Sequence, residues 1–190
     1  MIKKLAILCS KLHSIRLNKK LTKLDIQRFR INHGDEEITI KGFVRDSTQK
    51  DLKLNFTNVD LQKITPDIDS LRLDGNVNGK LDILQQNGSY LPNSNIVVDN
   101  FEVNKFLLGS FDATIKGNES LTNYKVDATI KNDITNSFSA TGEINVLENE
   151  SDIDVTLAFD QFNLFPLNPL LDGVLSNIRG TTTGDVKVIG

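Results

Sequence analysis

The residues of this chain that could carry out chemistry are few, and their spacing does not form a catalytic site. His13 and His33 are the two histidines, and neither has a Ser or Cys nucleophile placed beside it by spacing. Cys9 is the single cysteine, so the chain can form neither an internal disulfide nor a cysteine-based zinc site. The sequence therefore offers no nucleophile with a base to activate it.

Two further patterns come near to ligand-binding motifs and depart from them at essential positions. Asp67, Asp69 and Asp74 resemble a loose calcium loop, but no Glu occupies the twelfth position that such a loop requires. Gly180-x-x-x-Gly184 is not followed by Lys and Ser or Thr, so it is not a phosphate-binding loop. We therefore predict a protein that is not an enzyme and that uses no metal or cofactor.

Composition and charge narrow the class of protein further. The chain has 190 residues, of which 38% are hydrophobic and 25% charged, and it has no run of about 18 apolar residues that would cross a bilayer as a helix. Residues 1–30 carry nine Lys or Arg and one acid, whereas residues 31–190 carry thirteen bases and twenty-four acids. An acidic body of this kind is a poor ligand for phosphate backbones, so we expect no nucleic acid partner.

The first 22 residues form a basic lead segment that differs in pattern from the rest. Its charged start is similar to that of a signal peptide, but the apolar run 5–9 is shorter than such a signal needs. Leu5, Leu8, Leu12 and Ile15 fall at helical spacing, which is compatible with a short amphipathic helix. We divide the chain into this lead, residues 1–22, and a β segment, residues 23–190.

Alternation of apolar and polar residues dominates the β segment and predicts half-buried strands with one apolar face. Short turn signals such as Gln86-Asn87-Gly88-Ser89 separate about ten such runs, which favours an antiparallel meander. Weaker alternation comes first, at Leu24 and Ile26, at Ile38 and Ile40, and at Leu52, Leu54 and Phe56. The residues predicted to line the apolar face are Leu71, Leu73, Val77, Leu81, Ile83, Ile96, Val98, Phe111, Ala113, Ile115, Val126, Ala128, Ile130, Phe138, Ala140, Ile144, Val146, Ile153, Val155, Leu157 and Phe159.

Glycines inside the apolar register indicate where the strands bend. Gly75, Gly79 and Gly142 alternate in step with their apolar neighbours, and glycine inside a strand usually marks a bulge or a bend. Gly180 and Gly184 repeat the spacing of the first pair. We expect an all-β fold whose long, curved, mainly antiparallel sheet is folded into an open, taco-like trough; glycines that only make room in an ordinary sandwich are the alternative.

Two prolines predict short helical turns that belong to an internal repeat. Asn168 before Pro169 reads as an N-cap followed by the first helical residue, and Thr65-Pro66 offers a shorter version. Phe56, Val59 and Leu61 recur as Phe159, Phe162 and Leu164, and the paired glycines follow in both copies. Self-similarity at an offset of about 103–105 residues is typical of an array of repeated units, and we expect the chain to be a piece of a longer one.

The two repeated runs also resemble a known family. The segments NFTNVDLQKITPDIDSLRLDGNVNGKLDI at 55–83 and FDQFNLFPLNPLLDGVLSNIRGTTTGDVKVIG at 159–190 resemble the TamB family of the AsmA-like group, and YLPNSNIVVDNFEVNKFLLGSFDATIKG at 90–117 is similar to it. The shared pattern is a strand, a Leu- and Pro-rich turn, and then Leu or Ile-x-Gly-x-x-x-Gly, which leads into the next strand. The resemblance covers roughly residues 20–190.

This resemblance implies a function that composition and spacing do not supply. Members of the family are periplasmic β-proteins anchored in the inner membrane of Gram-negative-type bacteria, and their hydrophobic groove conveys phospholipid between the inner and outer membranes. They also support outer-membrane protein assembly with an outer-membrane barrel partner of the Omp85 type. The implied ligands are phospholipid acyl chains. The anchor itself is not present in these 190 residues.

The residues alone leave two functions open. An apolar face that no second layer of sequence covers could hold lipid acyl chains, whose methylenes each contribute about 0.8 kcal/mol when buried. It could equally belong to a non-catalytic structural β-repeat, such as a scaffold or adhesin segment, whose sheet closes over its own apolar face. Alternation does not distinguish protein from lipid as the covering layer.

Overall fold

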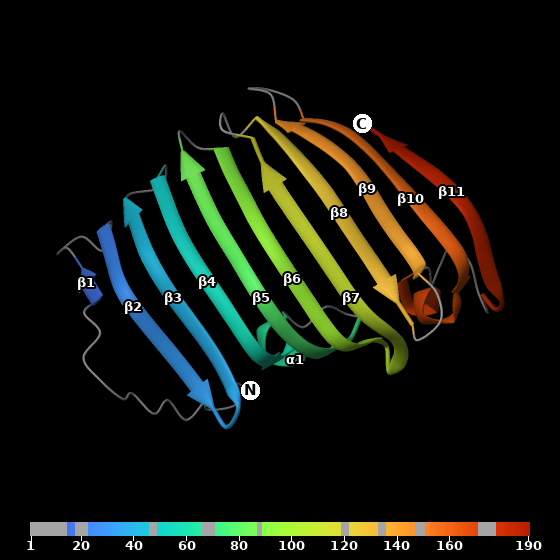
Figure 1. Ribbon diagram of the computed structural model, residues 1–190, viewed down its shortest axis with the longest axis horizontal. Helices are drawn as coiled ribbons and strands as arrows, with labels where there is room; N and C mark the ends of the chain where they lie inside the picture. Colours follow the sequence, from blue (N-terminus) through green and yellow to red (C-terminus); the bar gives the residue numbers. More distant parts are fainter. Residues whose placement is uncertain are drawn as a thin grey trace.

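The structure is a computed structural model of the whole chain. It describes residues 15–17, 23–45, 49–65, 71–86, 89–118, 122–132, 136–146, 151–170 and 178–190. Nearly all of these residues belong to strands, and Figure 1 shows the strands side by side in one curved layer.

One open sheet of eleven strands contains all of these strands, and its spatial order follows the sequence from β1 to β11. Every neighbouring pair is antiparallel, so the sheet is a meander with β1 and β11 at its two edges. The predicted all-β, antiparallel, open fold is thereby confirmed. The strands are β1 Ile15–Leu17, β2 Lys23–His33, β3 Glu36–Arg45, β4 Gln49–Asp60, β5 Leu73–Gln86, β6 Ser89–Val103, β7 Phe106–Gly117, β8 Asn123–Lys131, β9 Asn136–Val146, β10 Ser151–Asn163 and β11 Thr181–Ile189.

The β1 strand corrects the prediction for the lead segment. Ile15 shares helical spacing with Leu5, Leu8 and Leu12, but it lies in a strand and pairs with Ile26 of β2. Pairing with an apolar strand edge outweighs a weak helical pattern in so short a segment. The three leucines lie outside the described residues. No described helix is long and apolar enough to span a membrane.

β-bulges interrupt the alternation in four of the even-numbered strands. In each of them two apolar residues three positions apart flank the break in register, instead of two positions apart. The pairs are Ile26 and Phe29 in β2, Phe56 and Val59 in β4, Val98 and Phe101 in β6, and Phe159 and Phe162 in β10. Three bulges contain a non-glycine residue with positive φ, at 50° for Asn58, 53° for Asn100 and 47° for Gln161.

Glycines with positive φ lie directly opposite these bulges. Gly42 pairs with Ile26, Gly79 with Phe56, and Gly184 with Phe159, and their φ angles are 131°, 126° and 139°. A glycine and a bulge facing each other let both strands turn at the same level, which bends the sheet.

The remaining predicted bend glycines behave differently from one another. Gly75 is buried in β5 with φ 132°, and Gly142 lies between Val126 and Val155 with no positive φ. Gly180 does not lie on a strand, because it precedes β11 at a bend with φ 102°.

The first helical turn, α1, spans Leu61–Ile64, ends before Pro66 and was not predicted from the sequence. Asp60 caps it, because the Asp60 side chain accepts a hydrogen bond from the backbone N–H of Gln62 at 3.0 Å. Thr65 is the C-cap of α1, and its hydroxyl donates to the carbonyl of Leu61. The separate turn that Thr65-Pro66 predicts stays a prediction. Residues 66–70, with Pro66, lie outside the described residues.

The second turn, η1, is a 3-10 helix over Phe165–Leu170, and it begins earlier than predicted. Asn163 Oδ1 accepts from the N–H of Phe165 at 2.9 Å, so this asparagine takes the capping place that the sequence favours for Asn168. Asn168 instead joins η1 to Ile178, through hydrogen bonds of 2.7 Å to both its N–H and its carbonyl. Residues 171–177, which were expected to continue a helix, lie outside the described residues.

The internal repeat recurs in hydrogen bonds as well as in sequence. The Asn58 N–H donates to the side chain of Asn78 at 2.8 Å, and the Gln161 N–H donates to that of Thr183 at 3.0 Å. The Asp60 and Asn163 caps recur at the same offset. The units β4–α1–β5 and β10–η1–β11 are therefore built alike, although Gly180 is not in a strand as Gly75 is.

Candidate functional site

One face of the sheet carries an apolar surface that crosses strand after strand; we call it the apolar face. Directly paired residues of antiparallel strands point to the same side, so the register defines continuous rows of side chains. The central row takes one residue from each of β2 to β11 and contains no polar side chain. It runs through Ile31, Ile38, Phe56, Gly79, Ile96, Ala113, Ala128, Ala140, Leu157 and Val186.

A second row runs beside it and is nearly as apolar. Its ten positions include a single polar side chain, that of Ser94. It runs through Phe29, Ile40, Leu54, Leu81, Ser94, Ile115, Val126, Gly142, Val155 and Val188. The two rows together make a band that crosses the sheet from β2 to β11.

All of the residues predicted to line the apolar face lie on it. Their cross-strand partners share one side of the sheet, and none of them falls in the exposed class. Leu71 stands just before β5 and packs against the buried cluster around Val103. The face also includes apolar residues of β2 to β4 that were not among the predicted lining residues, such as Ile31, Ile38 and Phe56. Bulges break the alternation in β2 and β4, whereas β3 alternates without one.

The apolar face is packed most tightly toward the end of the sheet that carries α1 and η1, the lower end in Figure 1. Val59, Val77 and Val98 form one buried cluster, against which Leu61 of α1 packs. A second cluster consists of Val103, Leu108, Ile130 and Phe162. Leu164, just before η1, and Leu167, within η1, pack against it. Each repeated turn therefore covers one small core with a leucine.

Away from these turns the apolar face has no protein layer over it in the described part of the chain. Each strand makes its close contacts with its sheet neighbours, and no second sheet packs on this side. Ile83, Ile115, Val126 and Val155 are only half-buried as a result. Val186, at the edge, is 52% exposed although it ends the central row.

Tyr124 lies on the apolar face near one end of β8. It pairs with Gly117 and Ile144, and its side chain is buried. Burial raises the pKa of the Tyr124 hydroxyl to about 12, since the phenolate would lose its hydration there. The surroundings of Tyr124 therefore disfavour a charge.

The opposite face is charged and solvated. Lys125 and Glu143 pair across β8 and β9 at 3.8 Å, and Lys187 and Asp154 pair across β10 and β11 at 3.1 Å. These exposed pairs contribute little stability, but they fix this side as the one that faces water.

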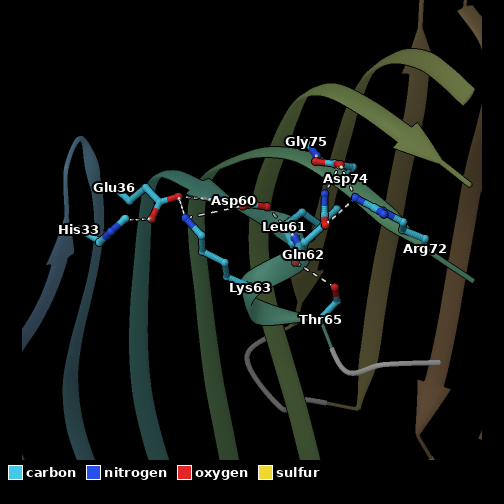
Figure 2. A network of polar contacts seen from close by, with 10 residues as sticks. All are labelled: His33, Glu36, Asp60, Leu61, Gln62, Lys63, Thr65, Arg72, Asp74 and Gly75. Carbon is cyan, nitrogen blue, oxygen red and sulfur yellow. Dashed lines mark hydrogen bonds and ion pairs between the residues drawn. The ribbon is translucent and has the colours of Figure 1, made fainter. Parts of the chain in front are cut away.

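A cluster of polar side chains lies where α1 meets the hairpin between β2 and β3, and Figure 2 shows it from close by. Lys63 of α1 places its Nζ 2.6 Å from Glu36 Oε1 and 3.6 Å from Asp60 Oδ2. The other oxygen of Glu36 lies 3.3 Å from His33 Nδ1, and the N–H of Asp60 donates to Glu36 Oε1 at 3.3 Å. Three contacts thus hold one carboxylate in place.

This arrangement shifts the pKa values of both members of the ion pair. The hydrogen bond from Lys63 holds the pKa of Glu36 below its usual value, and the same bond raises the pKa of Lys63. On the other side of α1, Gln62 hydrogen-bonds Asp74 and accepts from Arg72 Nη2 at 2.9 Å. The turn is therefore tied to β3 on one side and to β5 on the other.

A small cavity of about 130 Å³ lies beside this cluster. Its apolar wall is made by Ile31, Ile38, Val59 and Ile64, and its polar rim by His33, Glu36, Glu37 and Lys63. Since Ile31 and Ile38 begin the central row, the cavity is continuous with the apolar face. This cavity could not be predicted from the sequence, because Glu36 and Lys63 are 27 positions apart and meet only through the fold.

The other residues considered for chemistry are not brought together. His33 ends β2 and Asp74 lies in β5, whereas His13, Cys9, Asp67 and Asp69 lie outside the described residues. Within the described ranges, no three His, Cys, Asp or Glu side chains are grouped as metal ligands would be.

Comparison with known proteins identifies no relative. No protein family, no curated protein and no solved structure matches this chain significantly.

Proposed function

We propose that the apolar face binds the acyl chains of phospholipids, and that this chain is a segment of a protein that conveys phospholipid between two membranes. The central row carries the proposal, because ten successive strands contribute to it without a polar side chain. A sheet with one apolar face needs something to cover that face. Acyl chains are a covering that requires no further protein layer.

The size of the face suits an elongated apolar ligand. Eleven strands about 4.8 Å apart give a surface roughly 50 Å wide. Each acyl methylene removed from water there contributes about 0.8 kcal/mol, so a few chains would stabilise the face considerably. The repeated unit offers a way to lengthen such a surface by adding strands at an edge.

The resemblance of the two glycine-bearing runs to the TamB family supports the cellular setting that we propose. In that setting the segment lies in the periplasm of a Gram-negative-type bacterium and belongs to an inner-membrane-anchored protein. Its partner would be an outer-membrane barrel protein of the Omp85 type, and its activity would support outer-membrane protein assembly. A structural scaffold is the competing function, and the tightly packed clusters under α1 and η1 are the observation that favours it.

A pair of adjacent residues separates these two functions. Val126 lies half-buried in the second row, and Asp127 is exposed on the opposite face. The purified chain, Val126→Asp and Asp127→Lys are each incubated with phospholipid vesicles, separated from them, and analysed for retained phospholipid. Circular dichroism records whether each variant is folded.

The lipid-binding proposal predicts that the unchanged chain and Asp127→Lys retain phospholipid. Val126→Asp should stay folded and retain at least about tenfold less, because an unpaired carboxylate against acyl chains costs several kcal/mol. Unfolding of Val126→Asp alone, with no lipid on the unchanged chain, would instead establish a closed structural core.

A further inference from the structure

We propose that the cavity between α1 and the β2–β3 hairpin binds the headgroup of a zwitterionic aminophospholipid, one that carries an ammonium and a phosphate. This inference rests on the lipid-binding function proposed above, and it adds a site of headgroup selection to a face that is otherwise indifferent to headgroups. The proposal follows from the cavity's position, its volume and the two signs of charge on its rim.

The position places a headgroup at the end of the acyl path. Ile31 and Ile38 belong both to the cavity wall and to the central row, so a chain lying along that row reaches the cavity without crossing a polar barrier. Val59 and Ile64 close the remaining apolar side. A cavity of about 150 Å³ can hold a benzene ring, so about 130 Å³ has room for the ethanolamine part of a headgroup, which is smaller than that ring.

The rim presents both charges that a zwitterion needs. Lys63 and Glu36 of the rim provide an ammonium and a carboxylate 2.6 Å apart, and Asp60, beside the rim, adds a second carboxylate 3.6 Å from Lys63. A bound headgroup can exchange with this ion pair, its phosphate taking Lys63 and its ammonium taking Glu36 and Asp60. In the complex Lys63 pairs with the phosphate, and the two carboxylates pair with the ammonium of the ligand. No carboxylate is therefore left without a cation.

The members of the rim differ in how firmly they are held, which favours this exchange. The Lys63 side chain is 40% exposed and can turn toward a phosphate without disturbing the core. Glu36 is 19% exposed and keeps two further contacts, to the N–H of Asp60 and to His33, when Lys63 leaves it. The carboxylate is therefore already oriented to receive an ammonium.

A purely anionic headgroup fits this rim less well. Glu36, Glu37 and Asp60 lie around the cavity or against Lys63, and Arg30 already contacts Glu37 at 3.2 Å. An anion without an ammonium would compete with these carboxylates for Lys63 and would leave Glu36 without its closest cation. The rim should thus prefer phosphatidylethanolamine over phosphatidylglycerol.

The test uses the full chain and vesicles of equal parts phosphatidylethanolamine and phosphatidylglycerol. After incubation and removal of the vesicles, mass spectrometry gives the total phospholipid retained and the ratio of the two lipids. The variants are Glu36→Gln, which removes the ammonium acceptor, and Ile64→Phe, which fills the cavity from an exposed wall residue. Asp127→Asn is the control, since it makes the same kind of change on the opposite face.

The unchanged chain and Asp127→Asn should retain more phosphatidylethanolamine than phosphatidylglycerol. Both cavity variants should lower that ratio about three- to fivefold, the size expected for one contact between half-exposed charges, with total lipid nearly unchanged. Lipid retained at the ratio of the vesicles by all four proteins would overturn the headgroup site while leaving the proposed function standing. Absence of any retained lipid on the unchanged chain would overturn both.

Discussion

Gly79 lies so close to Asn95 that a Cβ atom at Gly79 would stand 2.1 Å from the Asn95 carbonyl oxygen. The glycine also has φ 126°, and it lies opposite the bulge in β4. Its lack of a side chain therefore serves two needs at once, the close approach of β6 and the turn of the sheet. Gly42 and Gly109 show the same close approach to carbonyl oxygens of neighbouring strands.

Three glycine substitutions separate these two needs. Gly142 has the close approach alone, at 2.1 Å from the Asp154 carbonyl oxygen, and Gly184 has the positive φ alone, with nothing within 4 Å. Gly79→Ala should lower the free energy of unfolding most, by about 3 kcal/mol or more, and Gly184→Ala least, by about 1 kcal/mol. Gly142→Ala should fall between them. Urea unfolding measures all three, and equal losses would contradict the assignment of separate costs to the close approach and the positive φ.

The equivalence of Asn58 and Gln161 leads to a second prediction. Both have positive φ inside a bulge, where asparagine is far better tolerated than glutamine. Gln161→Asn should raise the free energy of unfolding by about 0.5 kcal/mol, and Asn58→Gln should lower it by a similar amount. Thermal unfolding of the two variants checks this, and a change of the same sign in both would contradict the equivalence.

The ion pair between Glu36 and Lys63 makes stability depend on pH in a defined direction. Because the pKa of Glu36 is lowered in the folded chain, its contribution is present above the unfolded value of 4.5 and is lost as the pH falls through the folded value. The raised pKa of Lys63 gives the opposite sign, so its contribution is present below 10.5 and is lost as the pH rises through the folded value.

Glu36→Gln should therefore be less stable than the unchanged chain at neutral pH by up to about 1 kcal/mol, the value of a partly exposed pair. The difference should begin to shrink below about pH 4.5, where Glu36 becomes protonated in the unfolded chain, and should vanish once the pH lies below the lower, folded pKa of Glu36. Urea unfolding of the two proteins between about pH 3 and 9 measures it, a range that covers the loss of the Glu36 contribution and ends below that of Lys63. A difference that grows toward acid would show that the pair does not stabilise the fold.

Much of this fold can be predicted from the sequence because a sheet with one solvated face has a period of two. The alternating residues Leu71, Leu73, Gly75 and Val77 predict both the strand and its apolar side, and Gly75 among them predicts the bend. The bulges could not be predicted in the same way, since Phe56 and Val59 stand three positions apart and break that period. A Phe-x-Asn-Val sequence opposite a glycine is the signal that would have revealed such a bulge.

The helical turns and the cavity were harder to predict for different reasons. Proline is a strong local signal, but α1 begins five residues before Pro66 and depends on the Asp60 side chain that caps Gln62. The meeting of Glu36 with Lys63 depends on the pairing of β3 with β4 and on the direction in which α1 leaves β4. Such a contact has no signature in a single sequence.

The central claim is that acyl chains lie on the apolar face and not on the other, and site-specific photocrosslinking tests it most directly. Ile115 and Lys116 are neighbours on opposite faces of β7, and a benzophenone side chain is introduced at each in turn. After illumination of the chain with phospholipid vesicles, intact-mass analysis should find a phospholipid adduct at position 115 and none at position 116. Adducts at both positions in equal amount, or at neither, would contradict the account.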